Sequence, residues 1–156
     1  MSEKAETQIW NSPLSVGERV DFNKTIAESD VYLFAGITGD LARNHVDEEY
    51  MKKSPYGKRI VHGALLVGFM STTSSLIIQN AVASGIDETP VSVGYDRIRF
   101  IKPVFIGDTI TVRYEIIEIQ PEKRRSLAKI DMTNQNKELV CAAQHILQWV
   151  KAEPRN

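Results

Sequence analysis

The sequence predicts an α+β fold, in which an antiparallel β-sheet curls around one unusually apolar helix. The segment "HGALLVGFMSTTSSLIIQNAVASG" is about six helical turns long, and its first half is apolar on nearly every side. A helix of this kind is buried all round rather than laid on a surface. Several long segments after it alternate between apolar and polar residues, which is typical of strands. Strands joined by short connections pair antiparallel, so we expect a sheet that wraps the helix.

The segments ahead of the central helix have their own patterns. "RVDFNKTI" places Val20 and Phe22 between polar neighbours, which predicts a short strand. "ESDVYLFAGITG" repeats apolar residues at helical spacing, with Glu28 near its start and Gly39 in a position to end it. "VDEEYMKK" predicts two further helical turns, which end at Pro55.

Four later segments predict the rest of the sheet. They are "VSVGYDRIRFIK", "DTITVRYEIIEI", "RSLAKIDMTN" and "ELVCAAQHILQWV", with a turn at "NQNK" before the last of them. In the second segment Ile110, Val112, Tyr114 and Ile116 fall on one face, which we expect to lie against the helix.

Length and composition indicate one domain. The chain has 156 residues, 42% of them hydrophobic, which is enough for one compact core. We expect a flexible segment at residues 1–12 and a single domain at residues 13–150. The formal net charge of -1 gives no general reason to expect binding to nucleic acid or to an anionic membrane.

Cysteine content and hydropathy predict a cytoplasmic location. Cys141 is the single cysteine and cannot form a disulfide within the chain. The polar start "MSEKAETQIW" does not have the apolar segment of a signal peptide. Serines and threonines at residues 71–75 interrupt the most apolar run, so no transmembrane helix is expected.

Asp40 and His45, in "TGDLARNH", are the first candidates for chemistry. On one regular helix, five residues would separate them by about 140°, on different faces. They converge only if the chain between them is a loop, and Gly39 makes a helix end plausible there. An Asp in a turn and a solvated His are also common without any function. Two such residues with no further His or Cys pair nearby do not make a zinc pattern, so no metal is predicted.

The pair His62-Gly63, at the start of the central helix, is the second candidate. The first amides of a helix have no partner within it and carry partial positive charge, so they can polarise a carbonyl. A glycine there lets another group approach the backbone closely. Tight packing under the sheet would equally explain Gly63. For the side chain of His62, a core position with a backbone partner is the expected role.

Three more polar residues have weaker patterns. Ser71 lies two turns into the same helix, where a serine usually bonds a preceding carbonyl. Lys58 and Arg59 lie just before the helix, either in a solvated loop or in a position to bind a phosphate.

Taken together, these pieces resemble a known family. "FAGITGDLARNHVDEEYMKKSPYGKRIVHGALLVGFMS" resembles the hydratase motif of the MaoC-like dehydratases, the group that includes the (R)-specific enoyl-CoA hydratases. "VGYDRIRFIKPVFIGDTITV" resembles the strand pair that follows in the same family. The likeness runs from about Val20 to about Ile119. Its combined motifs are specific, although each alone would be weak.

The resemblance implies a hot-dog fold, (R)-specific hydration of a 2-enoyl-CoA or the reverse dehydration, and a homodimer or higher oligomer. It implies that Asp40 and His45 activate water and that the Gly63 amide polarises the thioester carbonyl. Ser71 and Asn44 would be supporting residues, and Lys58 and Arg59 would contact the CoA phosphates. Coenzyme A is then part of the substrate, and no cofactor is expected.

One departure from the family affects the loop. The family commonly has Asn-Pro between the Asp and the His, where this chain has Ala42-Arg43. A proline would stiffen the loop, so its replacement puts the rigidity of the site in question. Arg43 is also a candidate to change what lies above the acyl pocket.

Two other functions fit the same fold. A hot-dog thioesterase would need a carboxylate on the central helix, and residues 63–83 contain no Asp or Glu. A non-catalytic acyl-CoA-binding or assembly subunit is the second alternative, against which both Asp40 and His45 are present.

Overall fold

The computed structural model describes residues 10–83 and 85–151. Five strands and four α-helices follow one another in the order that the sequence predicts, with one 3₁₀ turn. Their bounds are β1 (Arg19–Thr25), α1 (Glu28–Thr38), α2 (Arg43–Val46), α3 (Glu48–Met51), α4 (Gly63–Ala83), β2 (Glu88–Phe100), β3 (Thr109–Gln120), η1 (Pro121–Lys123), β4 (Arg125–Thr133) and β5 (Leu139–Lys151).

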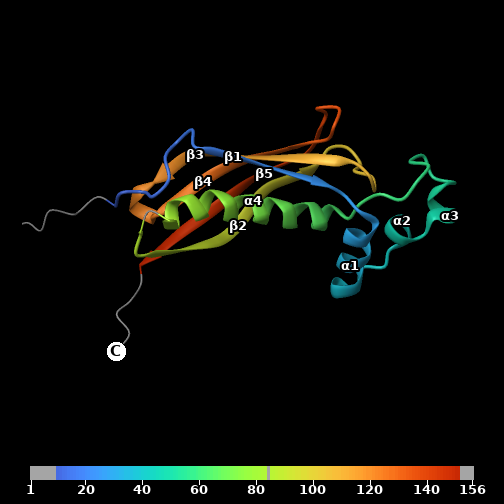
Figure 1. Ribbon diagram of the computed structural model, residues 1–156, viewed down its shortest axis with the longest axis horizontal. Helices are drawn as coiled ribbons and strands as arrows, with labels where there is room; N and C mark the ends of the chain where they lie inside the picture. Colours follow the sequence, from blue (N-terminus) through green and yellow to red (C-terminus); the bar gives the residue numbers. More distant parts are fainter. Residues whose placement is uncertain (1–9, 84, 152–156) are drawn as a thin grey trace, which may run out of the picture.

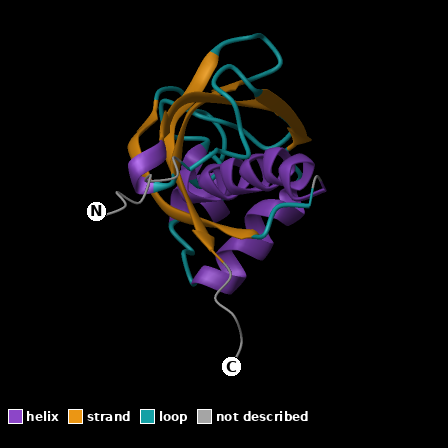
Figure 2. Ribbon diagram, turned by 90° about the vertical axis from the view of Figure 1, so that its left-hand side faces the viewer, coloured by secondary structure: helices purple, strands orange, loops and turns teal. Residues whose placement is uncertain are grey.

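The strands form one antiparallel sheet in the order β1-β3-β4-β5-β2. The sheet bends around α4, which lies along its concave face (Figures 1 and 2). This is the predicted α+β architecture of a sheet wrapped around a central helix.

The core lies between α4 and the sheet. The predicted inner face of β3 is confirmed, because Ile110, Val112, Tyr114 and Ile116 are all fully buried. Six residues of α4 are buried: Leu66, Met70, Thr73, Ser74, Ile77 and Ala81. With 21 residues and a mean hydropathy of 1.3, α4 also meets the length and composition of a membrane span. The sheet covers one side of α4, but the prediction that this helix is buried all round is wrong, because only 33% of the apolar window is buried and residues such as Ser71, Thr72 and Ser75 are exposed.

The short helices α1, α2 and α3 gather at the N-terminal end of α4 (Figure 1). The end of α1 is as predicted, since Gly39 follows it in the left-handed conformation. The two turns predicted at "VDEEYMKK" were wrong in extent, because α3 covers Glu48–Met51 alone. The side chain of Asp47 accepts a hydrogen bond from the Tyr50 amide and caps α3, which starts at Glu48, two residues after the start of the predicted segment.

The N-terminal segment predicted to be flexible, residues 1–12, is described only from Trp10 onward; residues 1–9 lie outside the described part. The Trp10 indole donates to both carboxylate oxygens of Glu88 at 3.1 Å. The Arg124 guanidinium binds the same carboxylate and lies 5.4 Å from the centre of the Trp10 ring. Trp10 is therefore packed against the start of β2.

Candidate active site at the start of the central helix

Asp40 is placed by the end of α1. Gly39 has φ 78°, which a glycine adopts without strain, and its amide donates to the Ala35 carbonyl at 2.9 Å. The chain then turns, since the Thr38 hydroxyl accepts from the Asp40 amide at 3.2 Å and an Asp40 carboxylate oxygen accepts from the Ala42 amide at 3.3 Å. Asp40 therefore lies in the loop between α1 and α2, and His45 lies within α2, so the two residues are not on one regular helix and can converge.

His45 is 8% exposed and held in one orientation. Its Nδ1 lies 2.8 Å from the Ile60 carbonyl oxygen. A carbonyl only accepts, so Nδ1 carries the hydrogen and Nε2 of the neutral ring carries the lone pair. The Asn44 side-chain amide lies 3.2 Å from Nε2 and donates to it. Nε2 is therefore the acceptor nitrogen of the ring, and in this structure its one lone pair receives the Asn44 amide.

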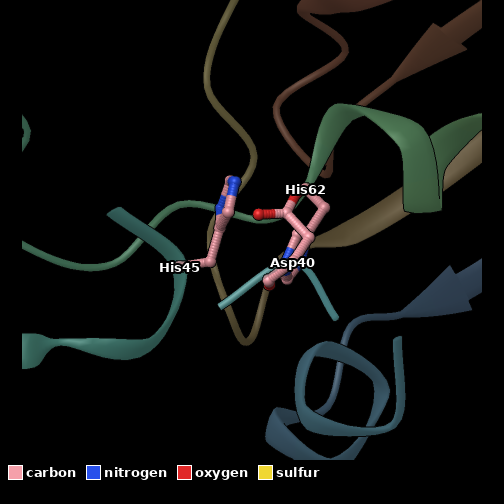
Figure 3. Close-up of side chains that lie close together, drawn as sticks. All are labelled: Asp40, His45 and His62. Atoms are coloured by element: carbon pink, nitrogen blue, oxygen red, sulfur yellow. The ribbon is translucent and has the colours of Figure 1, made fainter. Parts of the chain in front are cut away.

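His62 contacts both Asp40 and His45. It is 1% exposed, and its Nε2 donates to the Asp40 carbonyl at 3.0 Å. Its ring stacks on that of His45 with centroids 3.8 Å apart and an interplanar angle of 27° (Figure 3). The expected role of the His62 side chain, a core position with a backbone partner, is confirmed. Its contact with His45 was not expected.

Asp40, His45 and His62 bring one carboxylate oxygen and two ring nitrogens within 4.8 Å of one another. Such a group can hold a metal ion when its lone pairs point to one place. The lone pair of an imidazole lies in the ring plane, so two nearly parallel stacked rings do not aim at a common point. Three of the four ring nitrogens already have protein partners. This geometry suits acid–base work better than metal binding.

A cavity of about 400 Å³ opens beside this cluster. Its lining includes His45, Asn44, Gly63, Leu66, Phe100 and Tyr56. Gly63 is the first residue of α4, and no acceptor among the described residues takes its amide hydrogen. A free helix-start amide and the His45 ring therefore face one hollow that is large enough for a small acyl group.

The other predicted site residues divide into two groups. Asn44 lies in the cavity wall. Ser71 does not line the cavity; its carbonyl accepts from the hydroxyls of Ser74 and Ser75 further along α4. Its supporting role, like the roles of the other site residues, stays a prediction.

Lys58 and Arg59 have different surroundings. Arg59 is bound to Glu28 at 2.5 Å and to Glu48 at 2.8 Å, and these hydrogen-bonded carboxylates raise the pKa of its guanidinium. Arg59 therefore fastens α1 and α3 to the segment before α4. Lys58 has no ion pair among the described residues, and its Nζ lies 4.2 Å from the centre of the Phe105 ring.

Arg43 does not lie above the cavity. Its guanidinium pairs with Asp47 at 2.9 Å and stacks over the Tyr50 ring at 4.1 Å. Both contacts are within the layer of short helices, so Arg43 supports the loop from outside. The hydrogen bonds of Thr38 and Asp40 hold the turn that a proline would otherwise stiffen.

Sequence analysis did not identify two groups that shape the site. The Ile60 carbonyl fixes the His45 tautomer, and the Phe100 ring covers one side of Gly63. Every residue has a backbone carbonyl, so the residue type at position 60 could not indicate this hydrogen bond. Phe100 lies in a strand pattern that explains an apolar residue without any role in a site.

Comparisons with known proteins identify the family of this chain. The family model for MaoC-like domains matches residues 12–140. An (R)-specific enoyl-CoA hydratase of Rhodospirillum rubrum is 34% identical over 108 residues, which are 69% of each chain. A 3-hydroxybutyryl-CoA dehydratase of Methylorubrum extorquens is 35% identical over 118 residues, which cover 76% of this chain and 70% of that protein.

A solved structure supports the fold independently. The (R)-hydratase from A. caviae involved in PHA biosynthesis superposes with a TM-score of 0.73, covering 92% of this chain and 98% of that one. At 24% identity this likeness concerns the fold alone, and it confirms the hot-dog arrangement. Since the family model covers most of the chain and the relatives exceed 30% identity, this protein belongs to the MaoC-like dehydratase family, and (R)-specific enoyl-CoA hydratases are among its homologues.

Proposed function

We propose that this protein adds water to the double bond of a 2-enoyl-CoA thioester to give the (R)-3-hydroxyacyl-CoA, or catalyses the reverse dehydration. One observation carries the proposal. The Nε2 acceptor of His45 and the free amide of Gly63 share a cavity, with the Asp40 carboxylate within 4.8 Å of a ring nitrogen. The relatives named as (R)-specific hydratase and 3-hydroxybutyryl-CoA dehydratase support the reaction class and its stereochemistry.

In the proposed reaction, the water loses one proton and the α-carbon gains one proton. In the proposed complex the attacking water takes the place of the Asn44 amide at His45 Nε2 and donates its other hydrogen to the Asp40 carboxylate. As the water oxygen bonds to the β-carbon, the pair takes one proton from it. Because the Nδ1 hydrogen of His45 is committed to the Ile60 carbonyl, the proton delivered to the α-carbon is the one taken from the water. Positioned acid–base groups of this kind contribute factors of roughly 10²–10⁴.

The Gly63 amide supplies the second part of the mechanism. Negative charge develops on the thioester oxygen as the intermediate becomes an enolate. A free amide at the start of α4, reinforced by the helix dipole, stabilises that charge more than it stabilises the neutral carbonyl. One such donor is worth about 3 kcal/mol in the transition state. The residues of the chain are sufficient for this mechanism, with coenzyme A entering as part of the substrate.

The cation that we propose for the CoA phosphates is Lys58, because Lys102, which lines the cavity, is paired with Glu138. Lys58 is free of ion pairs among the described residues and lies on the segment that leads into α4. Arg59 already binds two carboxylates, so losing it would disturb the short helices as well as any phosphate. We therefore assign the phosphate contact to Lys58 before Arg59.

Incubation of the purified protein with crotonyl-CoA separates the proposed function from its alternatives. Loss of the enoyl absorbance without release of free thiol is the expected result, and chiral chromatography of the product tests the (R) configuration. Free thiol would indicate a thioesterase, for which α4 provides no carboxylate between residues 63 and 83. Neither signal, for any enoyl chain length, would favour the non-catalytic subunit. Asp40→Asn protein is the matched control for non-enzymatic loss of absorbance.

The proposed assembly is a homodimer that pairs through β2. Both β1 and β2 are edge strands, but the exposed side chains of β1 are polar or charged, as in Arg19 and Asp21. On β2, Val91 and Val93 are 42% and 48% exposed. An open edge with exposed valines is a surface that a second copy would cover. Sedimentation equilibrium at micromolar concentration tests this, and a 17.6 kDa monomer as the sole species would contradict it.

A further inference from the structure

Phe100 and Gly63 face each other across the cavity wall. A Cβ atom built on Gly63 would lie 2.7 Å from the Cε2 and Cζ atoms of the Phe100 ring. No other described group lies among the three nearest atoms to that position. The lack of a side chain at residue 63 therefore makes room for the Phe100 ring.

The backbone around Phe100 is fixed. Phe100 is the last residue of β2 and pairs with Cys141 in β5. The Ile101 amide donates to the Val140 carbonyl at 2.8 Å, and the Val61 amide donates to the Val104 carbonyl at 2.8 Å. The segment after β2 is thus hydrogen-bonded both to β5 and to the segment that leads into α4.

The ring of Phe100, in contrast, is half-exposed in the single chain. Its side chain is 55% exposed, although it is large and apolar. A half-exposed ring on a fixed backbone can turn away from its contact at little cost, because it gives up few buried contacts. It also keeps apolar surface in water that a bound ligand would cover.

On this basis, and resting on the function proposed above, we propose that Phe100 positions the thioester. Its ring occupies the space next to the Gly63 amide in the free protein and packs on the acyl thioester when substrate is bound. In that position the ring holds the thioester carbonyl against the Gly63 amide and excludes water from the amide hydrogen. Gly63 and Phe100 then act as one unit, since a methyl group at residue 63 would push the ring out of place.

The test is a double-mutant cycle with Gly63→Ala, Phe100→Ala and the double variant. For Phe100→Ala we expect KM for crotonyl-CoA to rise about tenfold, the upper range for one aromatic packing contact, with a smaller change in kcat. Phe100→Leu, which keeps an apolar wall, should recover most of this loss. Ile117→Ala is the control, because Ile117 is an exposed apolar residue of β3 that does not line the cavity.

The double variant decides the proposal. If the methyl group acts through the ring, the double variant is no worse than the poorer single variant, within about twofold, because the ring it would displace is gone. Losses in kcat/KM that multiply would overturn the proposal, as would Phe100→Ala with an unchanged KM. Melting temperatures within a few degrees of the parent protein verify that all variants are folded.

The outcome is distinguishable from failure of the proposed function. If the parent protein hydrates no enoyl-CoA, the proposed function fails, and calorimetric binding of butyryl-CoA replaces the assay. About tenfold weaker binding by Phe100→Ala would then support the positioning role. Equal binding, or no binding by the parent protein, would overturn it.

Discussion

Two clusters of polar side chains contain the three histidines of this protein, and they differ in what their histidines can reach. In the first, beside the cavity, His45 and His62 stack, and Nδ1 of His62 has no partner among the described residues. In the second, beneath α4, His145 is fully buried, and both of its ring nitrogens are bonded. Its Nδ1 lies 2.7 Å from the Tyr114 hydroxyl and its Nε2 lies 2.8 Å from the Ser92 hydroxyl.

The surroundings of His145 complete the second cluster, the His145 cluster. The Tyr95 ring stacks on it with centroids 4.4 Å apart. The buried Tyr95 hydroxyl approaches Ser71 and Ser74 of α4 without a hydrogen bond of normal geometry, and burial raises the pKa of this phenol. A histidine with both nitrogens satisfied and no access to a cavity stabilises the core. A histidine that presents an acceptor to a cavity is available for chemistry.

The largest expected effects belong to the cavity cluster. Asp40→Asn and His45→Gln should each lower kcat/KM for hydration by about a hundredfold to ten-thousandfold, which is about 3–5 kcal/mol in the barrier. Circular dichroism and the melting temperature should stay near those of the parent protein, because Asp40 is exposed and the cavity admits the new side chains. A near-normal rate in either variant would remove that residue from the mechanism.

The second prediction concerns the His145 cluster and the pH dependence of the free energy of unfolding. Burial lowers the pKa of His145 from its ordinary value of 6.5 to about 4. Between these values the unfolded chain binds a proton here and the folded chain does not. The free energy of unfolding should therefore be highest above pH 6.5 and fall toward pH 4, by roughly 3 kcal/mol from this residue.

Urea unfolding of the parent protein and of His145→Gln over this pH range measures the contribution. Above pH 6.5 the two curves should differ by a constant offset for the lost hydrogen bonds, and as the pH falls from 6.5 to 4 the parent protein should lose roughly 3 kcal/mol of stability relative to His145→Gln. Activity per folded molecule of His145→Gln at pH 8 should match the parent protein. Parallel curves, or a loss of kcat, would contradict the division between a structural and a chemical histidine.

The third prediction returns to the cavity and separates packing from function at Gly63. Gly63→Ala should lower the hydration rate about tenfold or more, while the melting temperature moves by only a few degrees, as about 1 kcal/mol would do in a domain of this size. The reason is that the new methyl group meets the exposed Phe100 ring, which can give way. Large destabilisation with unchanged activity per folded molecule would make Gly63 a packing residue instead.

The smallest effect is expected at Ser71, which lies on α4 between the two clusters. Its side chain approaches Tyr95 and does not line the cavity. Ser71→Ala should change kcat/KM by no more than about twofold, as is usual for an exposed residue outside a site. A tenfold loss of kcat/KM in steady-state assays would instead support the role in the site that the family resemblance implies for Ser71.

The sequence by itself determined the layers of this protein and the residue types of its site. Alternation in β3 assigned the buried face, since side chains of a strand point to opposite sides. The apolarity of α4 predicted a sheet packed against it, although the sheet of this chain covers only one side of the helix. Gly39 predicted the end of α1, because glycine readily adopts the left-handed conformation found there. A helix that ends before Asp40 makes the convergence of Asp40 and His45 possible.

The tertiary structure alone decided how those residues work. The Ile60 carbonyl fixes the tautomer of His45, and His62 stacks on it while bonding to the Asp40 carbonyl. The Phe100 ring reaches Gly63 from the end of a strand far along the chain. Periodicity assigns a residue to a face of its own element. Which carbonyl or ring meets that face from another element depends on how the sheet bends, and no local pattern in the sequence records that bend.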